Sequence, residues 1–335
     1  MKIAFYEASP SDQQYLRAAL AQTHEAVFSP DKLSPGNIAL AADADVVSTF
    51  IYSPVNDAAI RSMPRLKCVA TRSTGFDHID LAACQGRGIA VQNVPRYGEN
   101  TVAEHAFALI LSLSRNSHKL FTRMMTASEE ISRTGLIGFD LNGKTLGVVG
   151  AGKIGLHVIR IAKGFGMRVV VYSRSRDEFL SDLLGFEYTT FDELLGRSDI
   201  ISLHVPLTEH TRHLININTI EKIKPGAILI NTARGGVVSN DALVAALDRK
   251  ILAGAGLDAM ESEELVQQEI DPNSTETFTG LGKGLGLIYR DNVVFTPHIG
   301  YYSVEALNRI LDTTIVNIHG FAEGKILNSV IKEHR

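Results

Sequence analysis

Three side chains in the second half of the chain have the chemistry needed to move a proton beside a carboxylate. His298 titrates near neutral pH, and a nearby carboxylate such as Glu263 would stabilise its protonated form and fix its tautomer. Arg234 stays protonated, and the fork of its guanidinium suits a carboxylate. Together they could polarise a carbonyl and protonate the alkoxide that forms when it is reduced.

Each of these residues also has a purely structural interpretation. Arg234 could be an ordinary pairing partner between glycines, Glu263 could lie in the solvated acidic turn 261–264, and His298 could be a satisfied histidine at a strand end. All three follow predicted strands, and ligands of open α/β sheets bind beyond the carboxyl ends of the strands. Their joint placement therefore favours the catalytic interpretation.

The stretch 145–176 is the element around which the rest must be arranged. An apolar run enters the glycine cluster Gly150, Gly152 and Gly155, a helical segment follows, and a β-branched run closes the unit. The first glycine permits the turn, the second lets the backbone approach a pyrophosphate, and the third lets helix and strand pack closely. The helix N-terminus then offers free N–H groups to phosphates. This pattern predicts a dinucleotide site, and a structural glycine turn is the alternative.

Strand-like runs and helical segments alternate on both sides of this unit. Such alternation predicts parallel sheets with helices on their faces, so we expect an α/β protein with two doubly wound parallel-sheet domains. The other expected strands are 2–6, 46–52, 66–71, 89–94, 200–204, 227–231, 253–257 and 292–296. The expected helices include 13–21, 81–85, 99–125, 191–195, 219–223, 241–248 and 304–321, and the span 265–290 has no clear pattern.

Length and charge narrow the class of partner. The 335 residues leave room for about two domains. With a net charge of −4, the chain lacks the excess of positive charge that would favour binding to nucleic acid or to an anionic membrane. No apolar run approaches the roughly 18 residues of a membrane span, and the start of the chain does not resemble a signal peptide. We therefore expect a cytoplasmic protein that binds a small molecule, with no nucleic acid or membrane partner.

The cysteines and a group of histidines offer little support for a metal site. Cys68 and Cys84 lack CxxC spacing and are expected to be buried or free thiols in a reducing compartment. His204, His210 and His213 lie close in sequence, but they do not follow an apolar helical stripe. A solvated loop is the preferred interpretation, and no metal is expected.

Several motifs in order resemble the D-2-hydroxyacid dehydrogenase family over nearly the whole chain. The segments that carry the resemblance are GFDHIDL, NVPRYGENTVAEHAFAL, GVVGAGKIG, HVPLTEHTRHLIN, ILINTARGGVV, ILAGAGLDAMESEE and NVVFTPHIG. Tyr97, Tyr301 and the long span between Glu263 and His298 are similar to the D-lactate dehydrogenase branch.

The resemblance implies a split architecture and a reaction. A Rossmann coenzyme domain, 100–298, would be inserted into a flavodoxin-like substrate domain made of 1–99 plus 299–335, with the active site in the cleft and a homodimer as the assembly. The implied activity is the reversible reduction of a 2-oxo acid to a D-2-hydroxy acid by hydride transfer from NAD(P)H. Among the aromatic residues that could face the substrate is Phe50.

The same resemblance assigns roles to individual residues. The catalytic residues would be Arg234, Glu263 and His298. Substrate-binding residues would be Thr74, Gly75, Tyr97 and Tyr301. Phe50 joins them without support from the resemblance, as an aromatic residue that could face the substrate or belong to the core. Coenzyme-binding residues would be Lys153, Ile154, Val205, Pro206, Thr211, Thr232, Ala233, Arg234 and Asp258. To these are added Gly150, Gly152 and Gly155 of the glycine cluster, and Ser173 and Arg174, which depart from the family pattern.

One position departs from the NAD-selective members of the family. Eighteen residues after Gly155 they carry an aspartate that binds the ribose 2′-hydroxyl, but this chain has Ser173, followed by Arg174 and Arg176. A carboxylate would repel a 2′-phosphate, whereas a serine beside arginines would bind it. We therefore expect NADP as the preferred coenzyme and NAD as the second. The alternative is that the arginines are solvated charges at a helix start and that NAD is used.

A second class of function competes with catalysis. Corepressors that resemble this family keep the coenzyme fold as a sensor, and such a non-catalytic, dinucleotide-sensing protein would lack a catalytic residue. Arg234, Glu263 and His298 are all present here, so the enzyme is preferred.

Overall fold

The computed structural model describes residues 1–126, 132–261, 263 and 286–331, and it divides the chain into two compact units. The outer unit comprises Met1–Tyr97 and Ser303–Arg335, and the central unit comprises Gly98–Tyr302. The predicted domain boundaries lie between residues 99 and 100 and between residues 298 and 299. In the structure the units are divided between residues 97 and 98 and between residues 302 and 303. The outer unit is therefore built from two separate stretches of chain, as the inserted arrangement requires.

The outer unit is a five-stranded parallel sheet covered by helices on both faces. The strand order is β2-β1-β3-β4-β5, with β1 (Lys2–Phe5), β2 (Glu25–Phe28), β3 (Val46–Ser48), β4 (Cys68–Ala70) and β5 (Ala90–Gln92). Helices α1 (Pro10–Leu20) and α12 (Val304–Ala322) pack on one face; α2 (Asp57–Arg61), α3 (Leu81–Gly86) and the 3-10 turn η1 (Ile38–Ala41) pack on the other.

The C-terminal helix α12 completes the core of this unit. Its Leu311 and Ile318 are buried against Ile3 and Phe5 of β1, in a cluster of the same sheet face as α1. Tyr15 of α1 also donates a hydrogen bond of 2.6 Å to Asp312 of α12, although the two residues are 297 positions apart. The two chain segments therefore share one hydrophobic core.

The central unit is a seven-stranded parallel sheet with the order β12-β11-β10-β9-β6-β7-β8. The chain runs outward from β6 in one direction and then from β9 in the other, so β6 and β9 flank the topological switch point, where doubly wound folds bind their ligands. The strands are β6 (Thr145–Val149), β7 (Arg168–Tyr172), β8 (Glu187–Tyr188), β9 (Ile200–Leu203), β10 (Ala227–Asn231), β11 (Leu252–Leu257) and β12 (Val293–Phe295).

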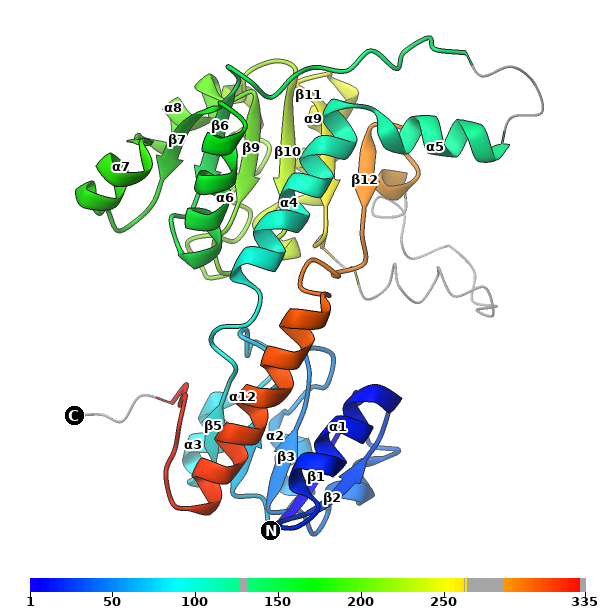
Figure 1. Ribbon diagram of the computed structural model, residues 1–335, viewed down its shortest axis with the longest axis vertical. Coiled ribbons are helices and arrows are strands. Elements are labelled where there is room, and N and C mark those ends of the chain that lie inside the picture. Colours follow the sequence, from blue (N-terminus) through cyan, green and yellow to red (C-terminus); the bar gives the residue numbers. More distant parts are fainter. Residues whose placement is uncertain (127–131, 262, 264–285, 332–335) are drawn as a thin grey trace. The chain divides into compact units, whose positions relative to one another are not determined.

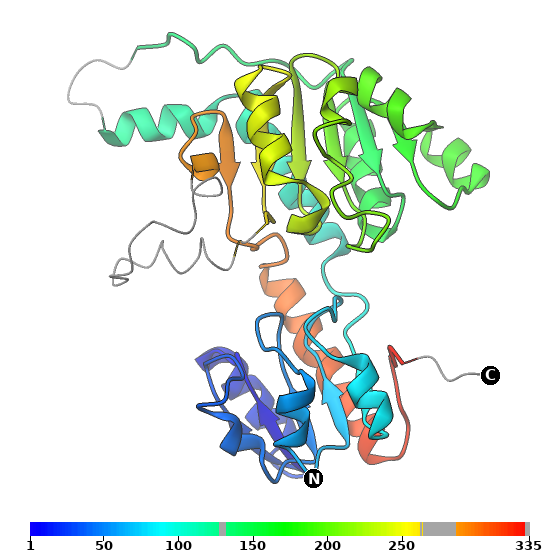
Figure 2. The same cartoon turned by 180° about the vertical axis from the view of Figure 1, so that it is seen from behind.

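Helices cover both faces of the central sheet. The first face is covered by α4 (Glu99–Ser114) and α6 (Lys153–Gly164), which contribute a buried cluster with the strands (Figure 1). The opposite face is covered by α8 (Phe191–Arg197) and α9 (Asn240–Asp248) (Figure 2). The unit also contains α5 (Ser117–Thr126), α7 (Glu178–Leu184) and the 3-10 turns η2 (Ile220–Lys222) and η3 (Gly235–Val237). The predicted α/β class with two parallel sheets is confirmed.

Two of the predicted helices are wrong in detail. The single helix 99–125 is two helices, α4 and α5, because Asn116 adopts a left-handed backbone with φ of +51° and ends the helical run. The helix expected at 219–223 is only the 3-10 turn η2. The span 265–290 lies largely outside the described residues. Of the helices that the structure describes, none has the length and apolar character to span a membrane.

Candidate active site

The glycine loop lies at the switch point, directly after β6. Gly150 has φ of +101°, and a Cβ atom on it would lie 2.6 Å from the carbonyl oxygen of His204, which follows β9. A Cβ atom on Gly155 would lie 2.0 Å from the carbonyl oxygen of Gly150. Around Gly152, in contrast, no atom of the described residues, apart from its chain neighbours, lies within 4 Å of such a Cβ atom. The protein itself requires the first and third glycines, and the second leaves open space for a ligand.

The start of α6 fits a phosphate group. Gly152 is the N-cap and provides no side-chain cap, and the first turn contains no acidic residue. The amide groups of this turn therefore point outward without a capping acceptor, and the dipole of the helix favours an anion there. Lys153 adds a positive charge, with its Nζ 4.0 Å from Oε1 of Glu99.

Thr232 provides an independent indication of a ligand site. It follows β10, and its Oγ1 is buried without a hydrogen-bond partner among the described residues. An unpaired buried hydroxyl is costly, so such a group usually meets a ligand or water. Ala233 is held beside it, because its amide donates to Oδ1 of Asn231 at 3.1 Å. The residues present therefore fit a dinucleotide.

The turn after β9 holds Val205, Pro206 and Thr211, three predicted coenzyme contacts. The Thr211 hydroxyl donates to the carbonyl oxygen of Pro206 at 2.6 Å, and the amide of Thr208 donates to that hydroxyl at 2.8 Å. Thr211 thus stabilises this turn, and its contact with a coenzyme stays a prediction.

The three histidines near this turn do not form a cluster. Nε2 of His204 lies 2.8 Å from Oγ of Ser202, whereas Nε2 of His213 pairs with Oε1 of Glu261 at 2.5 Å. His210 is exposed. Among the residues that the structure describes, no group of three or more histidine, cysteine, aspartate or glutamate side chains could hold a metal ion.

His204 should make the stability of the protein depend on pH. Burial lowers its pKa from 6.5 to about 3, so the folded state keeps it neutral while the unfolded state protonates it below pH 6.5. Its contribution is therefore complete above about pH 6.5 and is lost as the pH falls towards 3. Between pH 7 and pH 5 this amounts to about 2 kcal/mol, or about 3–6 °C in Tm.

We expect the Tm of His204→Gln to fall less steeply over this interval than that of the unaltered protein. The matched control is His210→Gln, which replaces an exposed histidine in the same turn and should leave the slope unchanged. Thermal unfolding followed by circular dichroism at a series of pH values measures both. Parallel Tm profiles for the unaltered protein and His204→Gln would contradict the argument.

His298 and Glu263 form a hydrogen-bonded pair. Nδ1 of His298 lies 2.7 Å from Oε1 of Glu263, and both side chains are 18% exposed. The other carboxylate oxygen, Oε2, accepts the amide of Met260 at 3.2 Å. An ionised carboxylate can only accept, so Nδ1 carries a proton and donates it to Glu263. The other ring nitrogen of His298, Nε2, is therefore the one available for proton transfer.

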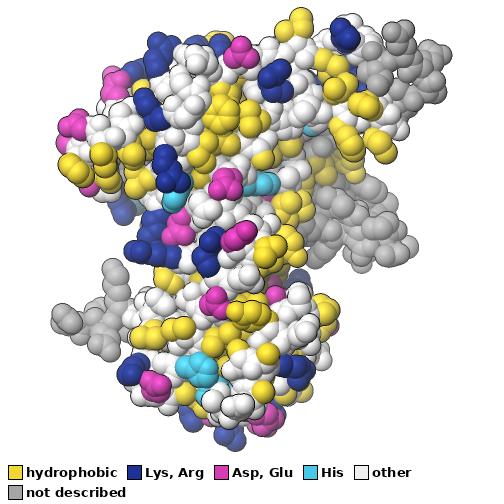
Figure 3. All heavy atoms as spheres, in the orientation of Figure 1, with side chains coloured by type: hydrophobic (Ala, Val, Ile, Leu, Met, Phe, Trp, Pro, Cys, Tyr) yellow, Lys and Arg dark blue, Asp and Glu magenta, His cyan; other side chains and the backbone are white. Residues whose placement is uncertain are grey.

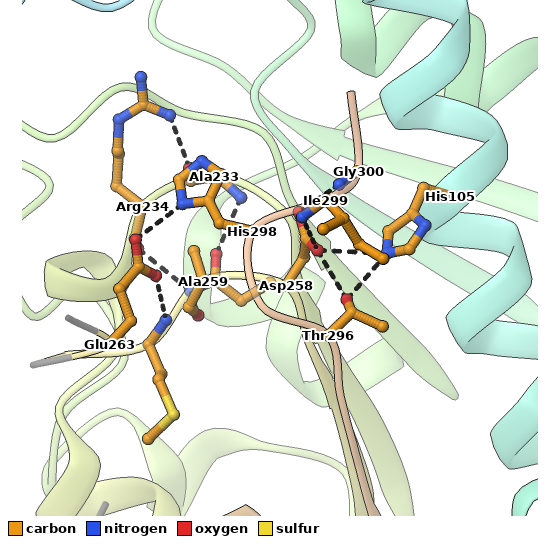
Figure 4. A network of polar contacts seen from close by, with 12 residues as sticks. His105, Ala233, Arg234, Asp258, Ala259, Glu263, Thr296, His298, Ile299 and Gly300 are labelled. Atoms are coloured by element: carbon orange, nitrogen blue, oxygen red, sulfur yellow. Dashed lines mark hydrogen bonds and ion pairs between the residues drawn. The ribbon is translucent and has the colours of Figure 1, made fainter. Parts of the chain in front are cut away.

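Arg234 lies on the same side of the network as this pair. It follows β10 immediately before η3, and its Nη1 donates to the carbonyl oxygen of Ala233 at 2.9 Å. Figure 4 shows its guanidinium beside the His298 ring, with Glu263 below. The three residues that were predicted from strand ends are thus brought together within the central unit.

Behind His298 lies a second group of polar residues, of which only Asp258 was assigned a role from the sequence. Asp258 follows β11, and its Oδ1 accepts the hydroxyl of Thr296 at 2.6 Å and lies 3.3 Å from Nε2 of His105. Nε2 of His105 also lies 2.9 Å from the Thr296 hydroxyl. His105 and Thr296 are 191 positions apart, so no local pattern could have joined them.

The outer unit presents two free backbone donors at Thr74 and Gly75. The Thr74 hydroxyl donates to the carbonyl oxygen of Val94 at 2.7 Å, and the carbonyl oxygen of Thr74 accepts Nδ2 of Asn93 at 2.8 Å. The carbonyl oxygen of Gly75 accepts the Ser73 hydroxyl at 2.6 Å. The amides of Thr74 and Gly75 meet no acceptor among the described residues. Hydrogen bonds to the neighbouring groups fix this turn, and its two amides remain available to donate to a carboxylate.

The aromatic residues predicted for the substrate are divided between the units. In the outer unit, the amide of Phe50 donates to Oε2 of Glu7 at 3.0 Å, and the carbonyl oxygen of Tyr97 accepts Nε of Arg309 at 2.7 Å. Tyr301 belongs to the central unit. Whether these side chains contact a substrate stays a prediction.

Ser173 and the arginines follow β7. Arg174 is exposed and has no ion-pair partner among the described residues. Arg176 lies over the ring of Tyr188, 5.7 Å from its centroid, and Asp177 caps α7 by accepting the amide of Leu180. Of the charged residues in this turn, Arg174 is therefore the one that the fold leaves available.

Comparison with known proteins identifies relatives over nearly the whole chain. A family profile described as "D-isomer specific 2-hydroxyacid dehydrogenase, NAD binding domain" matches residues 107–300. A "2-hydroxyacid dehydrogenase homolog" of Haemophilus influenzae is 34% identical over 99% of both chains, and a glyoxylate reductase of Thermococcus litoralis is 36% identical over 87% of this chain and 84% of its own. The crystal structure of Aquifex aeolicus D-lactate dehydrogenase complexed with NAD and lactic acid has 37% identity and a TM-score of 0.88, over 99% of both chains.

Proposed function

The chain belongs to the D-isomer specific 2-hydroxyacid dehydrogenase family, and from this membership we infer that it is an NAD(P)-dependent oxidoreductase that reduces a 2-oxo acid to a D-2-hydroxy acid. The observation that supports catalysis most directly is the 2.7 Å hydrogen bond between His298 and Glu263 beside Arg234 (Figure 4). The alternative of a non-catalytic sensor finds no support, because the relatives described above are named as dehydrogenases and reductases.

In the proposed mechanism, the guanidinium of Arg234 binds the carboxylate and the carbonyl oxygen of the 2-oxo acid. Glu263 holds the Nδ1 proton of His298 and stabilises the protonated imidazole. Nε2 of His298 then donates its proton to the carbonyl oxygen as this becomes a hydroxyl, and it takes that proton back in the reverse direction. The coenzyme supplies or accepts the hydride. The amides of Thr74 and Gly75, which meet no acceptor in the described part of the chain, support a role in binding the substrate carboxylate.

A panel of 2-oxo acids tests this function. Pyruvate, glyoxylate, hydroxypyruvate, 2-oxoisocaproate and phenylpyruvate would each be assayed with NADH and with NADPH, and the product would be resolved by chiral chromatography. We expect turnover of at least one acid, with only the D-hydroxy acid formed. Lack of turnover with every acid, or an L-product, would refute the proposal.

For the coenzyme, we propose a preference for NADP. Ser173 takes the place at which a carboxylate would repel the 2′-phosphate, and Arg174 beside it is an exposed cation without an ion-pair partner in the described part of the chain. Each charge-assisted contact to a phosphate is worth about 1.5–3 kcal/mol, enough for a preference of about 10–100-fold. The NAD in the Aquifex aeolicus structure makes NAD the competing choice.

Ser173→Asp should shift the ratio of kcat/KM for NADPH over NADH towards NADH by about 100-fold, because it restores the repelling carboxylate. Arg174→Ala should lower the same ratio by about 10-fold. The control is Arg176→Ala, which removes an arginine that is already engaged with Tyr188 and should leave the ratio within about twofold. A ratio well below one in the unaltered enzyme would refute the NADP preference.

We propose a homodimer as the assembly. Four apolar side chains on or beside α5 are more than half exposed: Phe121 at 66%, Met124 at 59%, Met125 at 72% and Ile137 at 93%. Figure 3 shows hydrophobic side chains gathered over this helix. A row of this kind is typical of a protein interface. A mass in solution of twice 36.4 kDa is expected from light scattering, and loss of that species in Phe121→Asp would locate the contact.

The cysteines support a cytoplasmic location. Cys68 and Cys84 are both buried and free, and burial raises the pKa of Cys84 to about 11. Such inert thiols are common in a reducing compartment.

A further inference from the structure

The carboxylate of Asp258 connects three elements of the central unit at the back of His298. Asp258 is only 3% exposed. Its Oδ1 accepts the Thr296 hydroxyl at 2.6 Å and the amide of Ile299 at 2.9 Å, and its Oδ2 accepts the amide of Gly300 at 2.9 Å (Figure 4). Both carboxylate oxygens are therefore already satisfied by donors of the protein.

These hydrogen bonds hold a backbone conformation that His298 rarely adopts. His298 has φ of +56°, in the left-handed region, where a residue other than glycine is disfavoured by about 1–3 kcal/mol. Its amide donates to the carbonyl oxygen of Asp258 at 3.0 Å, and the next two amides donate to the Asp258 carboxylate. Residue 258 thus fixes the turn on both sides of the His298 side chain.

Asp258 is in turn held in place from α4. Although burial alone would raise its pKa, the hydrogen bonds from His105 and Thr296 outweigh burial, and the pKa of Asp258 is lowered. Helix α4 packs directly on β11, because a Cβ atom on Gly256 would lie 2.9 Å from Cβ of Leu109. The close packing of α4 on β11 therefore places His105 beside Asp258.

The hydrogen-bonding capacity of the groups around His105 determines whether its Nε2 carries a proton. The single proton of the Thr296 hydroxyl is donated to Asp258, so that hydroxyl can only accept from His105. The carboxylate of Asp258 can also only accept. Nε2 of His105 must therefore carry a proton, which it shares between the Thr296 hydroxyl at 2.9 Å and Oδ1 of Asp258 at 3.3 Å.

We propose that His105 and Thr296 are positioning residues for the acid–base chemistry of His298, and that they act through Asp258. They fix the carboxylate that holds the left-handed turn, and the turn fixes where Nε2 of His298 meets the substrate carbonyl. The inference rests on the proposed function for its kinetic consequence. A misplacement of about 1 Å at the reacting group can cost about 100-fold in rate.

The test compares His105→Ala and Thr296→Val with two variants that keep the polar group, His105→Gln and Thr296→Ser. We expect the first two to lower kcat for the best 2-oxo acid by about 10–100-fold, while the Kd for NADPH and NADH stays within about threefold. The second two should recover most of the lost kcat. A general loss of structure would lower coenzyme binding and Tm in all four variants.

His118→Ala is the matched control. His118 lies on α5, and among the described residues its ring nitrogens contact the backbone of Ser112 and Asp291 and the hydroxyl of Ser112 rather than Asp258. Its kcat should equal that of the unaltered enzyme. A kcat within about twofold of the unaltered enzyme in His105→Ala, or a His105→Gln variant as slow as the alanine variant, would overturn the proposal.

Hydrogen exchange provides a readout that needs no turnover. In His105→Ala the amides of Ile299 and Gly300 should exchange about 10-fold faster, as measured by mass spectrometry of a peptide that covers 296–302. Exchange in a peptide from β6 should not change. If the unaltered protein reduces no 2-oxo acid, the proposed function fails, and the exchange at 299–300 alone then decides this inference. Unchanged exchange there would overturn it.

Discussion

Replacement of His298 by glutamine should lower kcat by about 1,000-fold or more and leave the Kd for the coenzyme nearly unchanged. Glutamine cannot take up and release a proton at neutral pH, so the carbonyl oxygen would have to be protonated by water. The coenzyme contacts that we propose lie in the glycine loop and after β7, β9, β10 and β11, and this substitution replaces none of those residues. Stopped-flow reduction of the best 2-oxo acid and fluorescence titration with NADPH and NADH measure the two quantities.

The left-handed backbone of His298 calls for a second variant. Asparagine adopts this region more readily than most residues, so His298→Asn should keep the turn while it removes the proton donor. Both variants should be inactive if the proton matters. An active His298→Asn would show that the turn, rather than the imidazole, is what the reaction requires.

A third variant, Glu263→Gln, separates the negative charge of residue 263 from its contact with His298. Its amide can still contact Nδ1 of His298 but no longer carries the negative charge that favours a protonated imidazole. We expect a loss of kcat of about 10–100-fold, smaller than that of the His298 variants. Equal losses at both positions would mean that Glu263 takes a direct part in proton transfer.

Gly152→Val and Gly155→Val should impair the protein for different reasons. The first should weaken coenzyme binding, and the second should destabilise the fold. A Cβ atom on Gly152 would have no described protein atom within 4 Å apart from its chain neighbours, and its φ of −74° suits any residue, so Gly152→Val should fold normally. It would occupy the space in which we expect the pyrophosphate. We therefore expect the coenzyme Kd to rise by about 100-fold or more, about 2.7 kcal/mol, with little change in Tm.

A side chain on Gly155, in contrast, would lie 2.0 Å from the carbonyl oxygen of Gly150. Helix α6 would have to move away from β6, at a cost of about 2–4 kcal/mol in the free energy of unfolding. Tm and the coenzyme Kd of the two valine variants, measured side by side, separate ligand space from packing. A large drop in Tm for Gly152→Val would contradict the assignment of that space to a ligand.

The sequence predicted best what depends on local pattern. The strand, glycine turn and helix at 145–164 need only neighbouring residues, and the structure has them as β6, the turn at Gly150 and α6. Arg234 and His298 could be proposed as site residues because each follows a strand that its own residues specify. The family assignment, supported by several such motifs in order, is confirmed.

Features that depend on distant partners were not predictable. The contact of His105 with Thr296 joins residues 191 positions apart, and nothing in either neighbourhood indicates the other. The short strands β2 and β8 exist because they pair with β1 and β7 at the sheet edges, not because of their own composition. The break at Asn116 interrupts an apolar periodicity that continues on both sides, so the pattern indicated one helix where there are two.

The sharing of one core by the two ends of the chain has a consequence during synthesis on the ribosome. Strand β1 is made first, but Leu311 and Ile318, which cover Ile3 and Phe5, are made last. At about 5–20 residues per second, the 297 positions between Tyr15 and Asp312 take about 15–60 s to translate. The central unit, one uninterrupted stretch, can fold within that time, while the first strands wait with their apolar face uncovered. A nascent chain stalled before α12 should therefore bind chaperones through its earliest residues rather than through its middle.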